Sequence, residues 1–465
     1  MATVAMGILL ATIDGSIVNV ALPTLMDSFS ADFASVQWVV LAYLLTLATL
    51  LLSMGRLADI IGKKRVYATG FVVFTAASAL CGLAPSINWL VGARVIQAAG
   101  AAMILALGPA IVTEIFPPNE RGRALGITGT MVSLGVILGP TIGGLLIQHL
   151  SWHWIFFVNL PIGIIGTLLA LRFVPARRPA GGQKFDFGGA LTIFFGLLAL
   201  LLALSLGQRW GFSDPRVLAL LAVFAVMAAS FVFIERRVAQ PMVDLRLFRN
   251  RLFSVNLLTG FITFVAMSGT TLLMPFYLQG ILGYHTQQIG LPMATVPIAM
   301  GIVAPFAGSL SDRIGTRPMT VVGLSVLLAG FLAISTLGLT TTAAGYILRF
   351  LPVGLGLGIF QSPNNSAIMG AAPRDRLGVV SGMLALTRTV GQTTGIALVG
   401  AAWASLTFAH AGQIYAEGAT AAQVGGLHDV LLALAGLLAV GVALAAWALM
   451  ESRRQAREAL QTASQ

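Results

Sequence analysis

The sequence predicts an all-α polytopic membrane protein, and three observations support this prediction. Of its 465 residues, 57% are hydrophobic and only 9% are charged, against about 25% charged in an ordinary soluble domain. The mean hydropathy is +0.91, and a soluble chain of this length could not cover so much apolar surface inside one or two cores. Fourteen stretches are also apolar over the roughly 20 residues that a helix needs to cross the hydrocarbon core.

The expected spans are separated by breaks that carry charged residues, Pro/Gly clusters or both, as loops between helices do. In chain order they are residues 4–25, 36–57, 66–84, 87–114, 122–148, 155–174, 187–207, 216–234, 252–280, 288–310, 318–338, 343–369, 377–408 and 427–450.

The basic residues gather on one side of the predicted membrane. With fourteen spans, alternate loops face the same side, and one side then carries 22 of the 27 Lys and Arg residues. Because cytoplasmic loops are rich in Lys and Arg, both termini are expected in the cytoplasm, with the protein in the cell membrane. The net charge of +11 therefore reflects topology, and no nucleic-acid partner is expected. The basic side holds Arg56, Lys63–Arg65, Arg121, Arg123, Arg172–Lys184, Arg236–Arg251, Arg313, Arg317, Arg374, Arg376 and Arg453–Arg457.

The two ends of the chain are copies of one another. The stretch Gly55–Lys64 recurs as Gly308–Arg317, with the shared pattern G-x-L-x-D-x-I-G-x-[KR]. A second series, Pro117 with five glycines, recurs at nearly the same offset. Spans one to six therefore match spans nine to fourteen, and spans seven and eight look inserted and peripheral. We expect a six-helix bundle in 1–174, two inserted helices with linkers in 175–251, and a second bundle with a cytoplasmic tail in 252–465.

Two parallel six-helix halves around a central path are typical of transporters. The repeated loop resembles the signature of the major facilitator superfamily, and four further stretches resemble motifs of its 14-helix drug:proton antiporters: Ala11–Pro23, Arg94–Gly100, Gly135–Gly144 and Trp152–Pro161. The resemblance implies a major facilitator fold, two six-helix bundles plus two inserted helices. It also implies export of small lipophilic compounds (multidrug efflux) by alternating access. The proton gradient would supply the energy, without a cofactor.

Asp14 is the only acidic residue deep inside a predicted span. A charge there costs about 2.5–3.5 kcal/mol on insertion scales, which is tolerated when the group faces a cavity or a partner. A carboxyl that alternates between two environments can load and release a proton; the alternative is a structural carboxylate. Arg94, within the fourth span, is expected to tune this proton exchange, unless it only reaches the outer interface.

Two further polar residues are assigned to the substrate cavity. Gln97 shares a helix face with Arg94, and Arg388 lies near the middle of the thirteenth span. A structural role for Arg388 stays open. The C-terminal half offers no second deep acid, so a substrate carrying two positive charges is disfavoured.

The repeated loop is predicted to gate the cytoplasmic side. Asp59 should face the positive end of the span that begins near Leu377, and Asp312 the one that begins near Gly122. Each acid could clamp the other half when that side is shut; an exposed loop acid is the plainer alternative. The predicted gate comprises Gly55, Asp59, Gly62, Lys63, Arg65, Asp312, Arg313 and Gly315.

A stripe of small residues follows in the fifth span. Residues spaced by four let backbones approach closely, and a proline adds a kink. The predicted antiporter motif, with a role in packing and gating, is Gly135, Gly139, Pro140, Gly143 and Gly144.

An enzyme is not expected. The G-x-x-x-x-G-K-[ST] loop of an ATP-driven pump is absent, as is H-E-x-x-H, and one cysteine with five scattered histidines suggests no metal site. The nearer alternatives are a proton-coupled exporter of a lipid or a specific metabolite, or an importer of the same fold. The expected partners are a small lipophilic substrate, protons and membrane lipid, and the protein is expected to work as a monomer.

Overall fold

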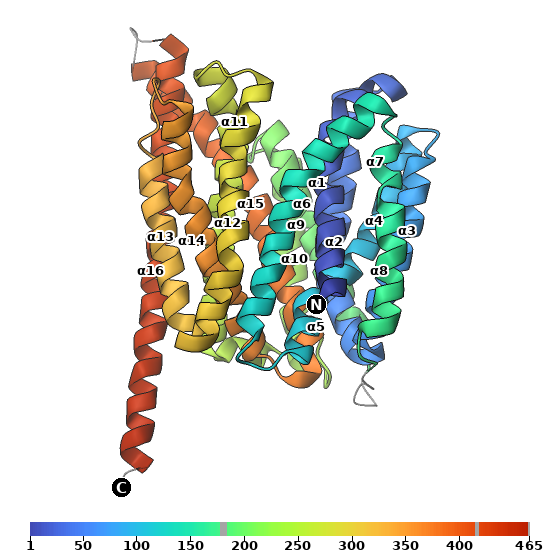
Figure 1. Ribbon diagram of the computed structural model, residues 1–465, viewed down its shortest axis with the longest axis vertical. Coiled ribbons are helices and arrows are strands. Elements are labelled where there is room, and N and C mark those ends of the chain that lie inside the picture. The colour runs from blue at the N-terminus through green and yellow to red at the C-terminus, as the bar shows by residue number, and fades with distance from the viewer. Residues whose placement is uncertain (177–183, 414–417, 464–465) are drawn as a thin grey trace.

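The computed structural model describes residues 1–176, 184–413 and 418–463, and within these ranges every regular element is a helix (Figure 1). The first part of the chain forms α1 (Ala2–Phe29), α2 (Phe33–Ile61), α3 (Lys63–Gly82), α4 (Ile87–Leu105), α5 (Gly108–Ile115), α6 (Arg121–His149), α7 (Trp154–Phe157) and α8 (Asn159–Phe173). Two helices follow, α9 (Phe187–Trp210) and α10 (Pro215–Arg237). The rest forms η1 (Leu245–Arg249), α11 (Arg251–Phe276), η2 (Tyr277–Ile281), α12 (Thr286–Ile314), α13 (Thr316–Ile334), α14 (Ala343–Gly370), η3 (Arg374–Arg376), α15 (Leu377–Gln413) and α16 (Gly418–Ala463).

The predicted all-α membrane fold is confirmed. Thirteen helical segments of the described residues are long and apolar enough to cross a membrane. Two of them are interrupted: the expected span 87–114 forms α4 and α5, which begins with Gly108 and Pro109, and the span 155–174 forms α7 and α8. The expected span 377–408 forms α15, but polar residues make its mean hydropathy lower than that of these thirteen segments. The number of fourteen crossings therefore stays a prediction.

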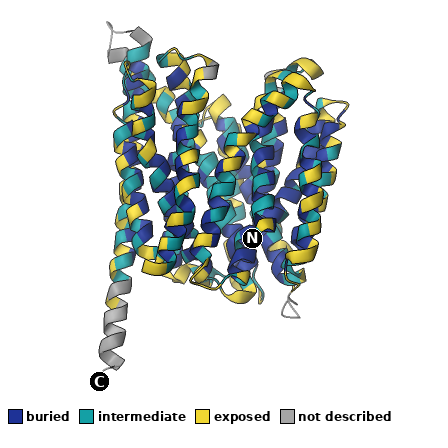
Figure 2. Cartoon of the chain, viewed as in Figure 1, coloured by how far each residue is buried: buried dark blue, intermediate teal, exposed yellow. Residues whose placement is uncertain are grey.

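Two large apolar cores organise the molecule, and a smaller buried cluster joins them across the seam, for example through Leu52 of α2 and Val380 of α15. One joins α1–α8 through buried side chains such as Leu10, Phe71 and Phe74. The other joins α11–α16 through side chains such as Leu273 and Phe331. Figure 1 shows the two groups of helices side by side, and Figure 2 shows their buried residues concentrated inside each group. This is the arrangement of two bundles, although the boundaries at 174 and 252 stay a prediction.

The repeat is visible in the backbone. Gly62 ends α2 with φ 103° and Gly315 ends α12 with φ 97°, and the next helix begins at the following residue in both cases. Glycine adopts such positive φ values without the steric penalty of a side chain. The same tight turn thus joins the second and third helices of each half, as a duplicated segment requires.

The two inserted helices differ in how they pack. α9 and α10 lie against one another, and α9 also contacts α2 and α15, one helix from each half. Leu201 of α9 packs against Leu45 and Ala48 of α2. Only 11% of the residues in the most apolar 18-residue stretch of α10 are buried. The expected peripheral position therefore fits α10, whereas α9 also bridges the two halves.

Candidate functional site

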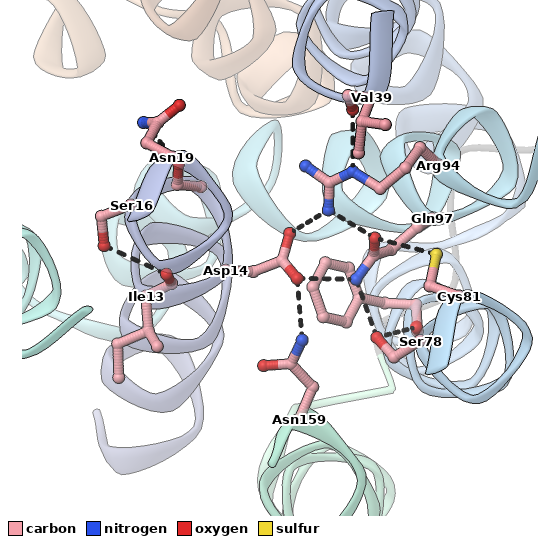
Figure 3. Close-up of polar contacts among 12 residues, drawn as sticks. Ile13, Asp14, Ser16, Asn19, Val39, Ser78, Cys81, Arg94, Gln97 and Asn159 are labelled. Atoms are coloured by element: carbon pink, nitrogen blue, oxygen red, sulfur yellow. Dashed lines mark hydrogen bonds and ion pairs between the residues drawn. The ribbon is translucent and has the colours of Figure 1, made fainter. Parts of the chain in front are cut away.

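Asp14 lies midway along α1 with no exposed surface and three hydrogen-bond donors around it (Figure 3). Arg94 Nη1 is 2.6 Å from Asp14 Oδ2. Gln97 Nε2 and Asn159 Nδ2 each donate to Asp14 Oδ1 at 2.8 Å. These side chains come from α4 and from the first residue of α8, so three helices meet at one carboxylate.

Arg94 is as deeply buried as its partner, with 1% of its surface exposed. Its Nε donates to the backbone oxygen of Val39 at 3.1 Å, and its guanidinium carbon lies 4.0 Å from the centre of the Tyr43 ring. A buried charge is tolerated only when it is paired and its hydrogen bonds are satisfied. The pair with Asp14 meets this condition and leaves the cluster with no net charge.

Gln97 belongs to this charge cluster. It accepts from Arg94 Nη1 at 2.6 Å and donates to Ser78 Oγ at 2.8 Å as well as to Asp14. It has no exposed surface. The structure therefore leaves Gln97 no free amide group for a substrate in this conformation, although it had been assigned to the cavity.

Asp59 caps the N-terminus of a helix in the other half. Its Oδ1 accepts a hydrogen bond from the Gly378 N–H at 2.8 Å and its Oδ2 one from the Val379 N–H at 2.9 Å. Lys63 Nζ lies 3.6 Å from Asp59 and 3.1 Å from Glu114. The carboxylate is thus held both by the positive end of α15 and by a lysine of its own half.

Asp312 makes the equivalent contact in the other direction, from the second half to a helix of the first. Its Oδ1 accepts from the Gly122 N–H at 2.8 Å and its Oδ2 from the Arg123 N–H at 3.0 Å, at the start of α6. Ser362 Oγ donates to the Gly122 carbonyl at 2.6 Å. These are the two contacts expected from the helix-dipole argument, and they hold the Lys/Arg-rich ends of the two halves together. That they open and close during transport stays a prediction.

Glycines allow this close approach. A Cβ atom at Gly55 would fall on the carbonyl oxygen of Gly378, and one at Gly308 on that of Gly122. Of the other predicted gate residues, Gly62 and Gly315 form the two positive-φ turns described above. The side chains of Arg65 and Arg313 are exposed.

The predicted antiporter motif packs α6 against α1. Cβ atoms at three of its glycines would overlap α1, whereas one at Gly144 would meet nothing within 4 Å. Ser16 Oγ donates to the Gly135 carbonyl at 3.0 Å, and Pro140 lies inside α6. The helix that carries Asp14 is therefore positioned by this stripe. The pairs are Gly135 with Thr12, Gly139 with Ser16 and Gly143 with Ile17.

Arg388 has a different environment from Arg94. It is half-buried in α15, with its guanidinium carbon 5.6 Å from the centre of the Phe264 ring. Phe264 and Thr387 line a small pocket between α11, α14 and α15, together with Asn364, whose buried Oδ1 has no partner among the described residues. Arg388 itself makes no hydrogen bond or ion pair within the part of the chain that the structure describes. It is a cation without a counter-charge.

The comparisons with known proteins identify the family. Residues 4–396 match the family model described as Major Facilitator Superfamily. The chain belongs to this superfamily. It is therefore an integral membrane protein and a transporter, not an enzyme.

Three similar proteins place this major facilitator among its relatives. It is 35% identical to the riboflavin transporter RibZ of Clostridioides difficile (strain 630), over 87% of this chain and 88% of the other. It is 33% identical to the multidrug transporter protein MdtP of Bacillus subtilis (strain 168), over 84% of this chain and 72% of the other. The crystal structure of the human organic anion transporter MFSD10 (TETRAN) shares its fold with a TM-score of 0.65, at 18% identity over 96% of this chain and 98% of the other.

Two polar contacts of this transporter had not been predicted. Asn159 donates to Asp14, and Glu114 pairs with Lys63. Asn159 is an amide inside an otherwise apolar span, which is a signal that could have assigned it to the charge cluster. Glu114 could be recognised only from the fold, because its partner lies on another helix.

Proposed function

We propose that the chain is a proton-coupled antiporter that exports small lipophilic compounds by alternating access. The observation that carries the proposal is the carboxylate of Asp14, buried inside α1 and held by Arg94, Gln97 and Asn159. An ionisable group at this depth marks an ion or proton path. The transporter would work as a monomer in the cell membrane, with its Lys/Arg-rich end and both termini in the cytoplasm.

The proposed coupling begins at the ion pair. A proton on Asp14 neutralises the carboxylate, whereas Arg94 keeps its charge. A buried arginine that loses its counter-charge is strongly destabilised. The arrangement of α1 and α4 that suits the ionised pair is therefore no longer favoured, and this difference drives the conformational change.

The signal would reach the gate through α6. Asp14 lies two residues from Thr12 and from Ser16, which pack on Gly135 and Gly139 of α6. The N-terminus of α6 is in turn held by Asp312. A shift of α1 therefore acts on a helix whose other end closes the cytoplasmic side, and release of Asp312 and Asp59 would open that side to the substrate.

Named relatives and one unpaired charge support the substrate class. A relative is called a multidrug transporter and another a riboflavin transporter, so the substrate is an organic compound of drug size. Asp14 is already neutralised by Arg94, while Arg388, which lies over the Phe264 ring, has no acidic partner among the described residues. Neutral, zwitterionic or anionic compounds fit this charge balance better than permanent cations.

Measurements of substrate and proton movement in proteoliposomes test the proposal. Purified protein would be reconstituted with a pH-sensitive dye inside the vesicles, and a panel of lipophilic compounds would be added with and without an imposed pH gradient. Antiport predicts substrate movement against the proton flux and dissipation of the gradient only when a substrate is present. Transport that ignores the gradient, or that runs with the protons, would reject antiport.

The similarity to RibZ favours a second candidate, a transporter dedicated to one metabolite. It predicts that a single compound of the panel, such as riboflavin, is transported and that unrelated drugs neither compete nor move protons. An importer of the same fold would show proton and substrate moving in one direction. The same vesicles distinguish these cases.

A further inference from the structure

Two buried carboxyl groups meet where α9 begins and α10 ends. Asp186 is 8% exposed and its Oδ1 accepts a hydrogen bond from the Gly189 N–H at 2.9 Å. Glu235 is 4% exposed and its Oε2 accepts from the Val243 N–H at 3.2 Å. Each carboxyl group thus uses one oxygen to hold a backbone N–H.

The second oxygen of each group points to the same place. Among the described residues, neither Asp186 Oδ2 nor Glu235 Oε1 has a hydrogen-bond partner. A Cβ atom at Gly189 would lie 2.6 Å from the first and 2.7 Å from the second, so both oxygens lie against the same glycine. Two ionised carboxylates in such a site repel one another, whereas one shared proton removes a charge and gives both oxygens a partner.

The pair is connected to the gate. Arg376 Nη1 donates to the carbonyl oxygen of Pro241 at 3.2 Å, in the turn whose Val243 N–H is held by Glu235. Arg376 directly precedes α15, and the N-terminus of that helix is capped by Asp59. The chain of contacts therefore runs from the carboxyl pair, through one turn, to the clamp between the halves.

Charges on two other elements, η3 and α2, lie near the pair. The Glu235 carboxyl group interacts electrostatically with Asp186, with Arg376 of η3 and with Arg56 of α2. Arg56 also interacts electrostatically with Asp59 and Asp375. The two arginines favour a negative charge at the pair but do not hydrogen-bond its two unpartnered oxygens, so a shared proton remains the interaction that satisfies both.

We propose that Asp186 and Glu235 form a second proton-binding site, which holds one proton while the cytoplasmic side is closed and gives it up to cytosolic water when the cytosol becomes alkaline. Loss of the proton places two repelling charges between α9 and α10. Their repulsion pushes Glu235 away from Asp186, which shifts the 241–243 turn that Glu235 and Arg376 both contact, and the clamp at α15 loosens. The inserted helices thereby make the gate sensitive to cytosolic pH, independently of which substrate is carried.

Infrared spectroscopy and thiol labelling test this site without any transport. The variants are Asp186→Asn and Glu235→Gln, which keep the acceptor oxygens for Gly189 and Val243 but cannot share an acidic proton. Wild-type protein should show the carbonyl stretch of a protonated carboxyl group at neutral pH, and either variant should lose that band. Asp429→Asn is the control, because Asp429 is 46% exposed and pairs with His410 away from this site.

The gate is read with a cysteine at position 52, since the Leu52 side chain is buried in an apolar cluster with Val379 and Met383 of α15, across the seam between the halves, and the native Cys81 is itself buried. In the Leu52→Cys background, labelling relative to that of the unfolded protein at the same pH should rise with cytosolic-side pH. This dependence should be lost in both pair variants but kept in Asp429→Asn. An unchanged infrared band, or an unchanged pH dependence in both pair variants, would overturn the proposal. Because neither readout needs a substrate or a gradient, failure of antiport in vesicles would leave this result standing.

Discussion

Asn159 donates a hydrogen bond from Nδ2 to Oδ1 of Asp14 at 2.8 Å, while its own buried Oδ1 has no partner among the described residues. A protonated Asp14 would carry an O–H group in need of an acceptor. Rotation of the Asn159 side-chain amide by about 180° would bring that free oxygen toward Asp14. Asparagine can therefore serve the ionised form as a donor and the protonated form as an acceptor.

Asn159→Leu should slow proton-driven transport by roughly tenfold or more. A hydrogen bond to a charged group contributes about 1.5–3 kcal/mol, and each 1.36 kcal/mol is a factor of about ten in rate. Leucine has a similar volume but can neither donate nor accept, so both forms of Asp14 lose a partner. Initial rates in proteoliposomes measure the effect. Asn88→Leu, at an exposed position at the start of α4, should retain wild-type rates, and equal rates in both variants would remove Asn159 from the mechanism.

Asp59→Asn and Asp312→Asn should each loosen the closed, Lys/Arg-rich side. Both substitutions remove the charge that binds two backbone N–H groups of the opposite half. At roughly 1.5 kcal/mol or more for hydrogen bonds to a charged group, the open form gains about tenfold in population. Thiol labelling at position 52 should rise accordingly, with substrate affinity unchanged. Asp214→Asn, which alters only a local cap of α10, is the control. Unaltered labelling in both gate variants would show that these contacts do not close the gate.

Gly139→Ala should impair the transporter while Gly144→Ala is tolerated. A Cβ atom at Gly139 overlaps the Ser16 hydroxyl of α1, whereas one at Gly144 meets nothing within 4 Å. The added methyl group at the first position pushes α6 away from the helix that carries Asp14, two residues from Ser16. Thermal stability and transport rates are compared for both variants. Equal behaviour would mean that the stripe does not set the position of α1.

Arg388→Gln should change which substrates are carried. Without the unpaired guanidinium, anionic compounds should be transported more slowly and monovalent cations faster, with neutral analogues little affected. Arg388→Lys should keep the wild-type order, because it keeps the charge. Arg349→Gln is the matched control, since Arg349 donates hydrogen bonds to Thr336 and to the Gly345 carbonyl. Rates for a charged and a neutral analogue of one scaffold decide the matter, and an unchanged preference in Arg388→Gln would remove it from the cavity.

The buried ion pair and the gate could be predicted from the sequence, because polar groups are costly in lipid and therefore stand out in apolar spans. Asp14 and Arg94 stand out in apolar spans, and the structure joins them in one ion pair. The repeated loop also pointed to where Asp59 and Asp312 lie, since the helix ends opposite them follow from the duplication.

Other features depend on packing that the sequence does not encode locally. Residues 187–207 are apolar on every face, so no periodicity shows that α9 contacts both α2 and α15. Asp186 directly precedes α9 and Glu235 lies near the end of α10, at the ends of apolar runs where acids are ordinary. Only the fold shows that both are buried and lie against the same glycine. α15 is a continuous helix, although its glycine, threonine and arginine residues make its sequence less apolar than that of the other long helices.

Substrate-induced proton release from the purified transporter tests the central role of Asp14 most directly. Protein in weakly buffered detergent solution receives a transported compound, and a pH-sensitive dye records the protons released, for the wild type and for Asp14→Asn with substrate binding measured in parallel. Asp14 as the coupling site predicts proton release by the wild type and none by Asp14→Asn, although the variant still folds and binds. Equal proton release by the two proteins would contradict it.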